Sequence, residues 1–222
     1  LMIALVIELG GDEIDDLSHC MNSDTEPRLR PDMPLKLLKD IIKNQYDWAL
    51  KIDFSNPDII KNFNYLSENG LSLDILTNGG GVEAVKKIDK LAKKIPNLHI
   101  IANHVIGYDF DGKTVDPEWT KAVENLAKNK NVWCKISGLY QRSVEQPAPK
   151  DLSQYNEALD ILWKNLGEDR LIYGSNWPCT KHSGNYKSYV TLVNQYFSAK
   201  GQQACEKYFW KNASKAYRLN LK

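Results

Sequence analysis

The sequence lacks the spaced histidines and cysteines from which proteins commonly build metal sites. Its four histidines form no HxH, HxxxH or HExxH pattern, and its four cysteines form no CxxC pair. A catalytic zinc needs about three protein ligands and an open position, so we expect no metal and no other cofactor in this chain. The cysteines are Cys20, Cys134, Cys179 and Cys205. Their number and spacing indicate free thiols in a reducing compartment and a cytoplasmic location.

The chain also lacks an excess of one charge and a long apolar run. Lysine and arginine number 29 against 28 acidic residues, a net charge of +1, and the lysines are scattered, so nothing favours a nucleic-acid partner. No run is long enough to span a bilayer. The opening stretch LMIALVIELGG contains Glu8 and lacks the basic start of a signal peptide, so we interpret it as a core strand.

Strands and helices alternate along the whole chain, which we treat as one domain over 1–222. The expected strands cover Ile3–Glu8, Ala49–Phe54, Leu71–Leu76, Leu98–His104, Val132–Ser137 and Leu171–Ser175. The expected helices cover Met33–Gln45, Pro57–Asn69, Val82–Lys94, Pro117–Lys128, Leu152–Leu166, Tyr186–Ala199 and Gln202–Tyr217. This order predicts a parallel sheet with right-handed crossovers, either a barrel or an open doubly wound sheet.

Polar side chains on one face of the strands favour the barrel. Asp53, Asp74 and Lys135 each alternate with apolar neighbours, whereas strands covered by helices on both faces should be apolar almost throughout. We therefore expect an α/β fold, a (β/α)₈ TIM barrel with a polar lumen. Six strands are two short of a barrel, and Leu1 directly precedes the first, so we expect the N-terminal strand or strands to be missing. Exposed strand edges and apolar faces then predict self-association into a homo-oligomer, or poor solubility.

Active sites of barrels lie at the carboxyl ends of the strands, where His104 and Lys135 are the leading candidates. His104 precedes a long loop and suits a general acid, a metal ligand or a hydrogen-bond donor to a carbonyl. The alternative is a structural histidine bonded to the backbone. An unpaired buried ammonium is costly, so Lys135 should meet Asp74, Asp53 or a substrate anion. Structural pairing and substrate binding both stay open.

The stretch RLIYGSNWP, residues 170–178, predicts a strand that delivers Asn176 to the mouth of a pocket. Trp177 is placed to wall that pocket, and His182 follows in the next loop. Asn103 and Ser137, at two other strand ends, complete the candidate binding residues. His99 lies five residues before His104, so we expect it to face the opposite way, at the rim or on the helix side.

Five stretches in order resemble the amidohydrolase-2 family from Asn56 to the end, in particular its lactone-hydrolysing branch for sugar lactones and 2-pyrone-4,6-dicarboxylate. They are NGLSLDI, NLHIIANHV, NVWCKISGL, EDRLIYGSNWP and YFWKNASKAYRL. The resemblance implies a (β/α)₈ barrel that opens a lactone ring with water. His104 and Lys135 would contact the carbonyl and the carboxylate or hydroxyls of the ligand. The family's base is an aspartate where this chain has Asn176, and Asn103 replaces an aspartate before the histidine.

These departures leave three hypotheses. The first is a metal-independent hydrolase of carbohydrate metabolism that acts on a lactone or small carbohydrate acid. Its water would be activated weakly through Asn176, or by Asp74 or Asp53. An amide cannot accept a proton, so the second is a non-catalytic binding protein that retains the pocket. The third is a zinc-dependent decarboxylase or hydrolase whose HxH histidines lie upstream of Leu1.

Overall fold

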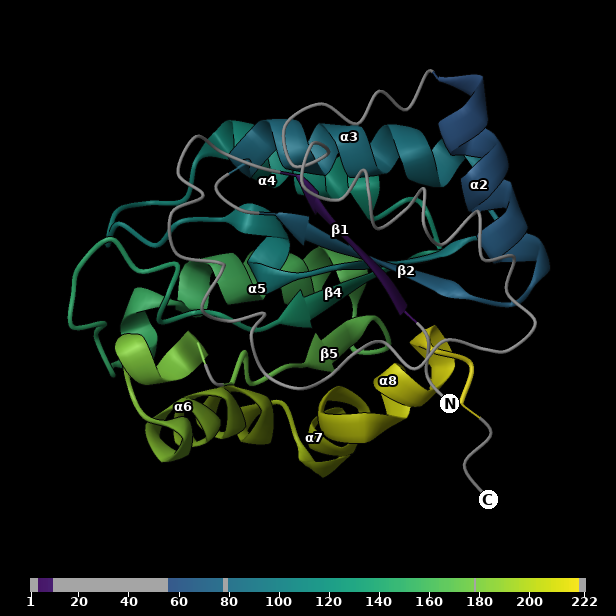
Figure 1. The fold of residues 1–222 in the computed structure, drawn as a ribbon. Helices are drawn as coiled ribbons and strands as arrows, with labels where there is room; N and C mark the ends of the chain where they lie inside the picture. The colour runs from purple at the N-terminus through teal and green to yellow at the C-terminus, as the bar shows by residue number, and fades with distance from the viewer. Residues whose placement is uncertain (1–3, 10–55, 78–79, 178, 220–222) are drawn as a thin grey trace.

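The computed structural model describes residues 4–9, 56–77, 80–177 and 179–219 (Figure 1). The predicted helix Met33–Gln45 and the predicted strand Ala49–Phe54, with Asp53, lie outside these residues. The described part nevertheless contains the ends of four strands at which candidate site residues were expected.

Five parallel strands form one sheet whose spatial order follows the sequence, β1-β2-β3-β4-β5. They are β1 (Ala4–Leu9), β2 (Ser72–Thr77), β3 (His99–Ala102), β4 (Val132–Ile136) and β5 (Leu171–Tyr173). In a doubly wound sheet the strand order reverses at a switch point, and no reversal occurs among these strands. The consecutive order is that of a barrel wall, so the predicted α/β barrel class is confirmed for the described part of the chain.

Helices follow the strands as the sequence pattern predicts. They are α2 (Pro57–Glu68), α3 (Gly81–Lys94), α4 (Pro117–Leu126), α5 (Asn156–Leu166), α6 (Tyr186–Ala199), α7 (Gln202–Glu206) and α8 (Asn212–Ala216). Asn56 and Asp116 cap α2 and α4 through their side chains, each before a proline, a favoured way to begin a helix. In Figure 1, α3 and α4 lie above the strands, and α6, α7 and α8 lie below them, next to β5.

Two expected helices are interrupted in the structure. A separate 3₁₀ turn, η3 (Leu152–Gln154), precedes α5, because the Asp151 side chain caps it and Tyr155 ends it. The closing helix expected over Gln202–Tyr217 contains a π-helical turn, η5 (Lys207–Lys211), between α7 and α8. Its Tyr208 is fully buried and stacks on Phe197 with ring centroids 3.6 Å apart.

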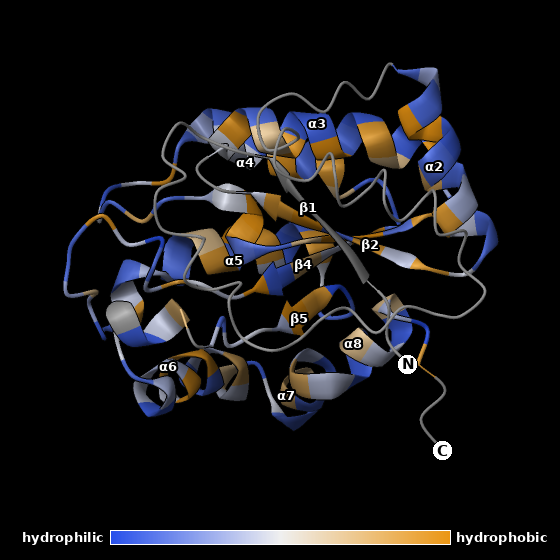
Figure 2. Ribbon diagram, in the orientation of Figure 1, coloured by the Kyte–Doolittle hydropathy of each residue, from blue (hydrophilic) through white to orange (hydrophobic). Residues whose placement is uncertain are grey.

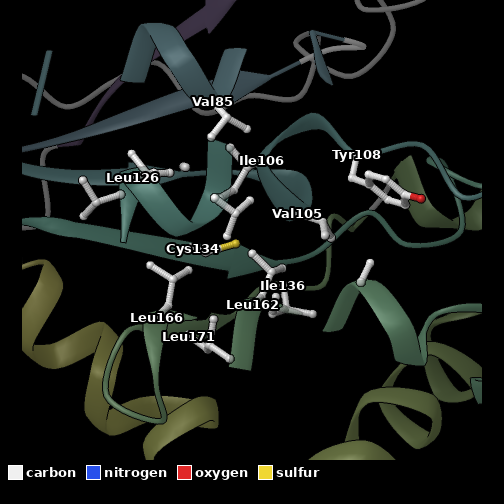
Figure 3. Packing of buried hydrophobic residues seen from close by; sticks show 14 of the residues in the cluster. Val85, Val105, Ile106, Tyr108, Leu126, Cys134, Ile136, Leu162, Leu166 and Leu171 are labelled. Carbon is white, nitrogen blue, oxygen red and sulfur yellow. The ribbon is translucent and has the colours of Figure 1, made fainter. Parts of the chain in front are cut away.

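The two faces of the strands differ as the alternation predicts. The outward face of β4 places Cys134 and Ile136 in the main core against helices (Figure 3), and the helices are banded with apolar and polar residues (Figure 2). The inward face instead carries Trp133, in a small cluster with Ile101, Ile172 and Ala216. The inward face is therefore free to carry polar residues nearer the carboxyl ends of the strands.

The amino ends of the strands are covered by α8. Ser72 Oγ donates to the carbonyl of Ala216 at 2.6 Å, and His99 Nδ1 lies 3.0 Å from the same oxygen. His99 also packs on Trp133 with ring centroids 4.6 Å apart. Of the two places expected for His99, the rim and the helix side, the structure shows the rim, because His99 begins β3 and borders a surface hollow. His99 shares the inward face with Ile101. The five-residue spacing from His104 misled because His104 lies beyond the end of β3, where the alternation of a strand no longer holds.

The cysteines correct a second expectation. Cys134 and Cys205 are free thiols as predicted, but Cys179 is disulfide-bonded. The lack of a CxxC pair excludes only a short-range link, and it says nothing about cysteines far apart in the chain. Among the described helices, none is long and apolar enough to cross a membrane.

Candidate functional site

The carboxyl ends of β3, β4 and β5 bring His104, Ser137 and Asn176 together. His104 Nδ1 lies 2.8 Å from Ser137 Oγ. Gly138 lies next to both His104 and Asn176: a Cβ placed on it would lie 3.0 Å from His104 Nδ1 and 3.5 Å from Asn176 Nδ2. Three side chains predicted from separate sequence stretches therefore surround one point above the sheet.

His104 is presented by a left-handed turn instead of the strand that the sequence predicts. β3 ends at Ala102, and His104, Val105 and Ile106 have φ values of 51°, 55° and 55°. Left-handed geometry costs roughly 1–2 kcal/mol for each such residue, so the turn stores about 3–6 kcal/mol. Val105 and Ile106 are fully buried in the core (Figure 3), which supplies part of the compensation. Backbone strain of this kind is concentrated at functional sites.

The start of this turn is tied to β2. Thr77 Oγ1 donates to the carbonyl of Asn103 at 2.8 Å, and the Asn103 N–H donates to the carbonyl of Ile75 at 2.9 Å. Gly107 ends the turn so close to β2 that a Cβ there would lie 2.8 Å from the Thr77 carbonyl oxygen. The sequence expectation that β3 runs through His104 is therefore wrong by two residues.

The His104 imidazole is neutral at neutral pH. Burial, together with the positive charges of Lys135 and Arg142, lowers its pKa to about 4, while a hydrogen bond to the Ser137 backbone opposes the shift. Ser137 Oγ accepts from the His104 backbone N–H at 3.4 Å, and its hydroxyl can at the same time donate to Nδ1. In that arrangement Nε2 carries the ring proton and is a hydrogen-bond donor. This favours a donor to a carbonyl over a general acid.

Lys135 is paired within the protein. Its Nζ lies 2.8 Å from Asp74 Oδ1, and the side chain of Asp74 is 4% exposed. Tyr217 donates its hydroxyl to the same carboxylate at 2.8 Å. Burial and the Asp74 charge raise the pKa of Tyr217, so its hydroxyl keeps its proton. Of the partners that the sequence left open for Lys135, the structure shows Asp74.

Two asparagines lie at the ends of β3 and β5. Asn176 adopts a φ of 51°, which asparagine tolerates better than most residues, and its carbonyl accepts from the Thr180 N–H at 3.0 Å. Asn103 is 5% exposed, and its Oδ1 finds no hydrogen-bond donor among the described residues. A buried acceptor of this kind calls for a donor from a ligand or a water.

The segment after β5 holds two further candidates. Trp177 follows Asn176 directly, is 53% exposed, and meets Tyr186 edge to face with centroids 6.0 Å apart. It is therefore available to a ligand at this end of the sheet. His182 closes the 3₁₀ turn η4 (Cys179–His182), and Asp53 lies outside the described residues.

Arg142 belongs to the site and escaped the sequence interpretation. Its Nη2 donates to the carbonyl of Gly107 at 3.0 Å, its Nε to that of Tyr108 at 3.3 Å, and it forms an ion pair with Asp109. Its backbone carbonyl accepts from the Phe110 N–H at 2.7 Å. No sequence motif identifies an arginine whose side chain donates to backbone carbonyls. The only sequence signal was its place in one of two long loops that follow strands.

The described donors do not fit a divalent metal by themselves. No group of three histidine, cysteine, aspartate or glutamate side chains converges within the described residues. At the strand ends one imidazole stands beside amides, an ammonium and a guanidinium, whose positive charge opposes a cation. A surface hollow of about 500 Å³ lies at the other end of the sheet, beside His99 and Trp133.

Comparisons with known proteins identify the family of the chain. A family model described as Amidohydrolase matches residues 45–219. An L-rhamnono-gamma-lactonase of Scheffersomyces stipitis is 28% identical over 187 residues, which cover 76% of this chain and 55% of the relative. An L-fucono-1,5-lactonase of Burkholderia ambifaria is 29% identical over 133 residues, 58% of this chain and 44% of the relative. The chain thus spans about half the length of the curated relatives it matches.

Solved structures share the fold. An amidohydrolase of Burkholderia multivorans, crystallised with bound zinc, has a TM-score of 0.68 at 18% identity and covers 98% of this chain and 74% of its own. A probable 2-pyrone-4,6-dicarboxylic acid hydrolase of Acinetobacter baumannii, with citric acid bound, has a TM-score of 0.64 at 16% identity. That likeness covers 86% of this chain and 71% of the other. At such identities the likeness concerns the fold alone.

Proposed function

The chain belongs to the amidohydrolase family, and on that premise we propose that it binds a sugar lactone at the carboxyl ends of β3, β4 and β5 and hydrolyses it slowly. The observation that carries the proposal is the convergence of His104, Ser137 and Asn176 around Gly138. The names of two relatives, a rhamnonolactonase and a fuconolactonase, favour a sugar lactone or the related carbohydrate acid as ligand.

The reaction needs a polarised carbonyl and a placed water. Neutral His104 would donate from Nε2 to the lactone carbonyl oxygen, with Ser137 holding the other ring nitrogen. The Asn176 amide would hold the water that adds to the carbonyl carbon. The bond from that carbon to the ring oxygen then breaks, the ring oxygen takes a proton, and a hydroxy acid results.

Proton removal from the water is the weak step. Asn176 cannot accept the proton, and loss of a general base typically costs ~10²–10⁴-fold in rate. Asp74 is a carboxylate, but Lys135 and Tyr217 already occupy its oxygens. We therefore expect water to be deprotonated largely by solvent, and turnover to be slow.

A second candidate function is binding without catalysis. It is favoured by the amide at position 176 together with the buried Oδ1 of Asn103, which has no hydrogen-bond donor among the described residues, since both amides can bind a hydroxylated ligand and neither can act as a base. In this case the hydroxylated ligand would be held and released unchanged.

A divalent metal enters the proposal only as an alternative. One structural neighbour was crystallised with zinc, but the described residues of this chain do not supply a ligand set. A zinc-dependent hydrolase or decarboxylase would need histidines outside them. Our proposed steps therefore use none of that chemistry.

The proposed partner is a small molecule, and a homo-oligomer and a cytoplasmic location stay predictions. Light scattering of the purified protein would decide the oligomeric state.

The first experiment compares the parent with Asn176→Asp on aldono-lactones and pyrone dicarboxylates, with and without EDTA. Asn125→Asp makes the same change of charge on α4 and is the matched control. We expect slow, EDTA-insensitive hydrolysis by the parent, and a kcat about 10²–10⁴-fold higher for Asn176→Asp alone. Calorimetry of the parent with the same lactones separates binding from turnover.

Each outcome decides between the candidates. Binding without hydrolysis by the parent, with activity gained in the variant, supports the binding protein. Loss of the parent's activity in EDTA, restored by zinc, supports the metal enzyme. Neither binding nor hydrolysis by either protein would refute the lactone assignment.

A further inference from the structure

The left-handed turn that carries His104 is fastened at both ends. Thr77 holds its start through the Asn103 carbonyl. At its end the carbonyls of Gly107 and Tyr108 both accept hydrogen bonds from the guanidinium of Arg142. The planar fork of arginine suits two acceptors at fixed spacing, whereas the single ammonium of lysine does not.

Arg142 is itself fixed relative to Gly138 and the turn that follows β4. Its backbone N–H donates to the carbonyl of Gly138 at 2.9 Å, so it belongs to the turn that begins where Gly138 meets the His104 ring. Its ion pair with Asp109 holds the guanidinium from the loop side. The same residue thus joins the turn after β3 to the turn after β4.

We propose that Arg142 is a positioning residue, which holds the left-handed turn so that the His104 ring stays between Ser137 and the ligand. It touches the turn and not the reacting atoms. The importance of this placement for catalysis rests on the proposed function, while the placement itself does not. Without the guanidinium, the end of the turn is free to return to right-handed geometry and to take the ring away from Ser137.

Arg142 also contributes to the electrostatic setting of the ring. The charged groups that act on His104 are Lys135 from β4 and Arg142 from the following loop, and both lower its pKa. Asp74 and Asp109 pair with these two cations and moderate their effect. Removal of Arg142 should therefore make His104 easier to protonate as well as less well placed.

The test uses the full chain labelled with ¹⁵N-histidine, with His104→Gln to assign the ring signals. Arg142→Met removes the fork, and Arg142→Lys keeps the charge without it. Arg170→Met is the matched control. Arg170 is also a buried arginine that donates to backbone carbonyls, those of Leu166, Asn129 and Ala127, but it lies at the amino end of β5.

We expect Arg142→Met to shift the His104 ring signals, to move its titration toward the usual pKa of about 6.5, and to lower kcat about 10²-fold. Arg142→Lys should shift the ring signals with a smaller change in titration. Arg170→Met should lose thermal stability while the His104 signals and titration stay in place.

Unchanged His104 signals and titration in folded Arg142→Met would overturn the proposal. If Arg142→Met does not fold, the ring signals of Arg142→Lys decide in the same way. A shifted ring in a protein that hydrolyses no lactone would refute the proposed function and leave the positioning role standing.

Discussion

Replacing Gly138 with alanine should displace His104 more than it strains the backbone. Gly138 has a φ of +66°, and its new Cβ would lie 3.0 Å from His104 Nδ1 and 3.5 Å from Asn176 Nδ2. The left-handed backbone costs an alanine roughly 1–2 kcal/mol, and forcing a methyl into filled space typically costs about 1–3 kcal/mol more. We expect Gly138→Ala to lose about 2–5 kcal/mol in total.

Gly70→Ala isolates the backbone part of that loss. Gly70 has nearly the same φ, +68°, and its new Cβ would meet only the end of the Arg218 side chain, at 3.5 Å. It should therefore lose only the roughly 1–2 kcal/mol of left-handed strain. The contact on the imidazole is the difference between the two variants.

Urea unfolding of parent, Gly70→Ala and Gly138→Ala measures this difference as about 1–3 kcal/mol. In a thermal melt each kcal/mol corresponds to roughly 2–4 °C for a chain of this size. The His104 ring signals should shift in Gly138→Ala alone, and lactone binding should weaken with them. Equal losses of stability in the two variants, with His104 unmoved, would show that the ring has room to spare.

Two further predictions concern charged groups. Because the pKa of His104 in the fold is about 4, below its ordinary value, the unfolded chain takes up the proton first as the pH falls. Stability should decline between about pH 6.5 and pH 4, by at most about 3 kcal/mol, and His104→Gln should show a flatter pH profile in urea titrations. Lys135→Met leaves the buried Asp74 carboxylate without its cation and should cost about 3–5 kcal/mol. The double variant Lys135→Met with Asp74→Leu should recover most of that stability, which urea denaturation measures. A Lys135→Met variant as stable as the parent would contradict the pairing.

The fold follows from patterns that the sequence displays openly. Alternation in 132–137 correctly placed Lys135 and Trp133 on the inward face and Cys134 on the outward face. The family resemblance is confirmed by the match over residues 45–219. Both inferences depend on local periodicity or linear motifs, which can be recognised in the sequence without knowledge of long-range contacts.

The site was less predictable because its key geometry contradicts local preference. Val105 and Ile106 are β-branched and disfavour left-handed geometry, so nothing in NHVIG announces a left-handed turn. Burial of both side chains and the bonds from Thr77 and Arg142 impose it. The partner of Lys135 was equally unpredictable: the sequence left Asp74, Asp53 and a substrate anion open, and only the structure shows Asp74 beside it.

The two long loops that follow β3 and β4 are joined as a pair. The Phe110 N–H donates to the Arg142 carbonyl at 2.7 Å, and the Val144 N–H donates to the Phe110 carbonyl at 2.8 Å. An insertion or deletion in one loop would break the register of the other, so the effects of changes in the two loops should be epistatic. Directed evolution of this protein toward new ligands should therefore vary both loops in the same library, because variants selected one loop at a time will not combine additively.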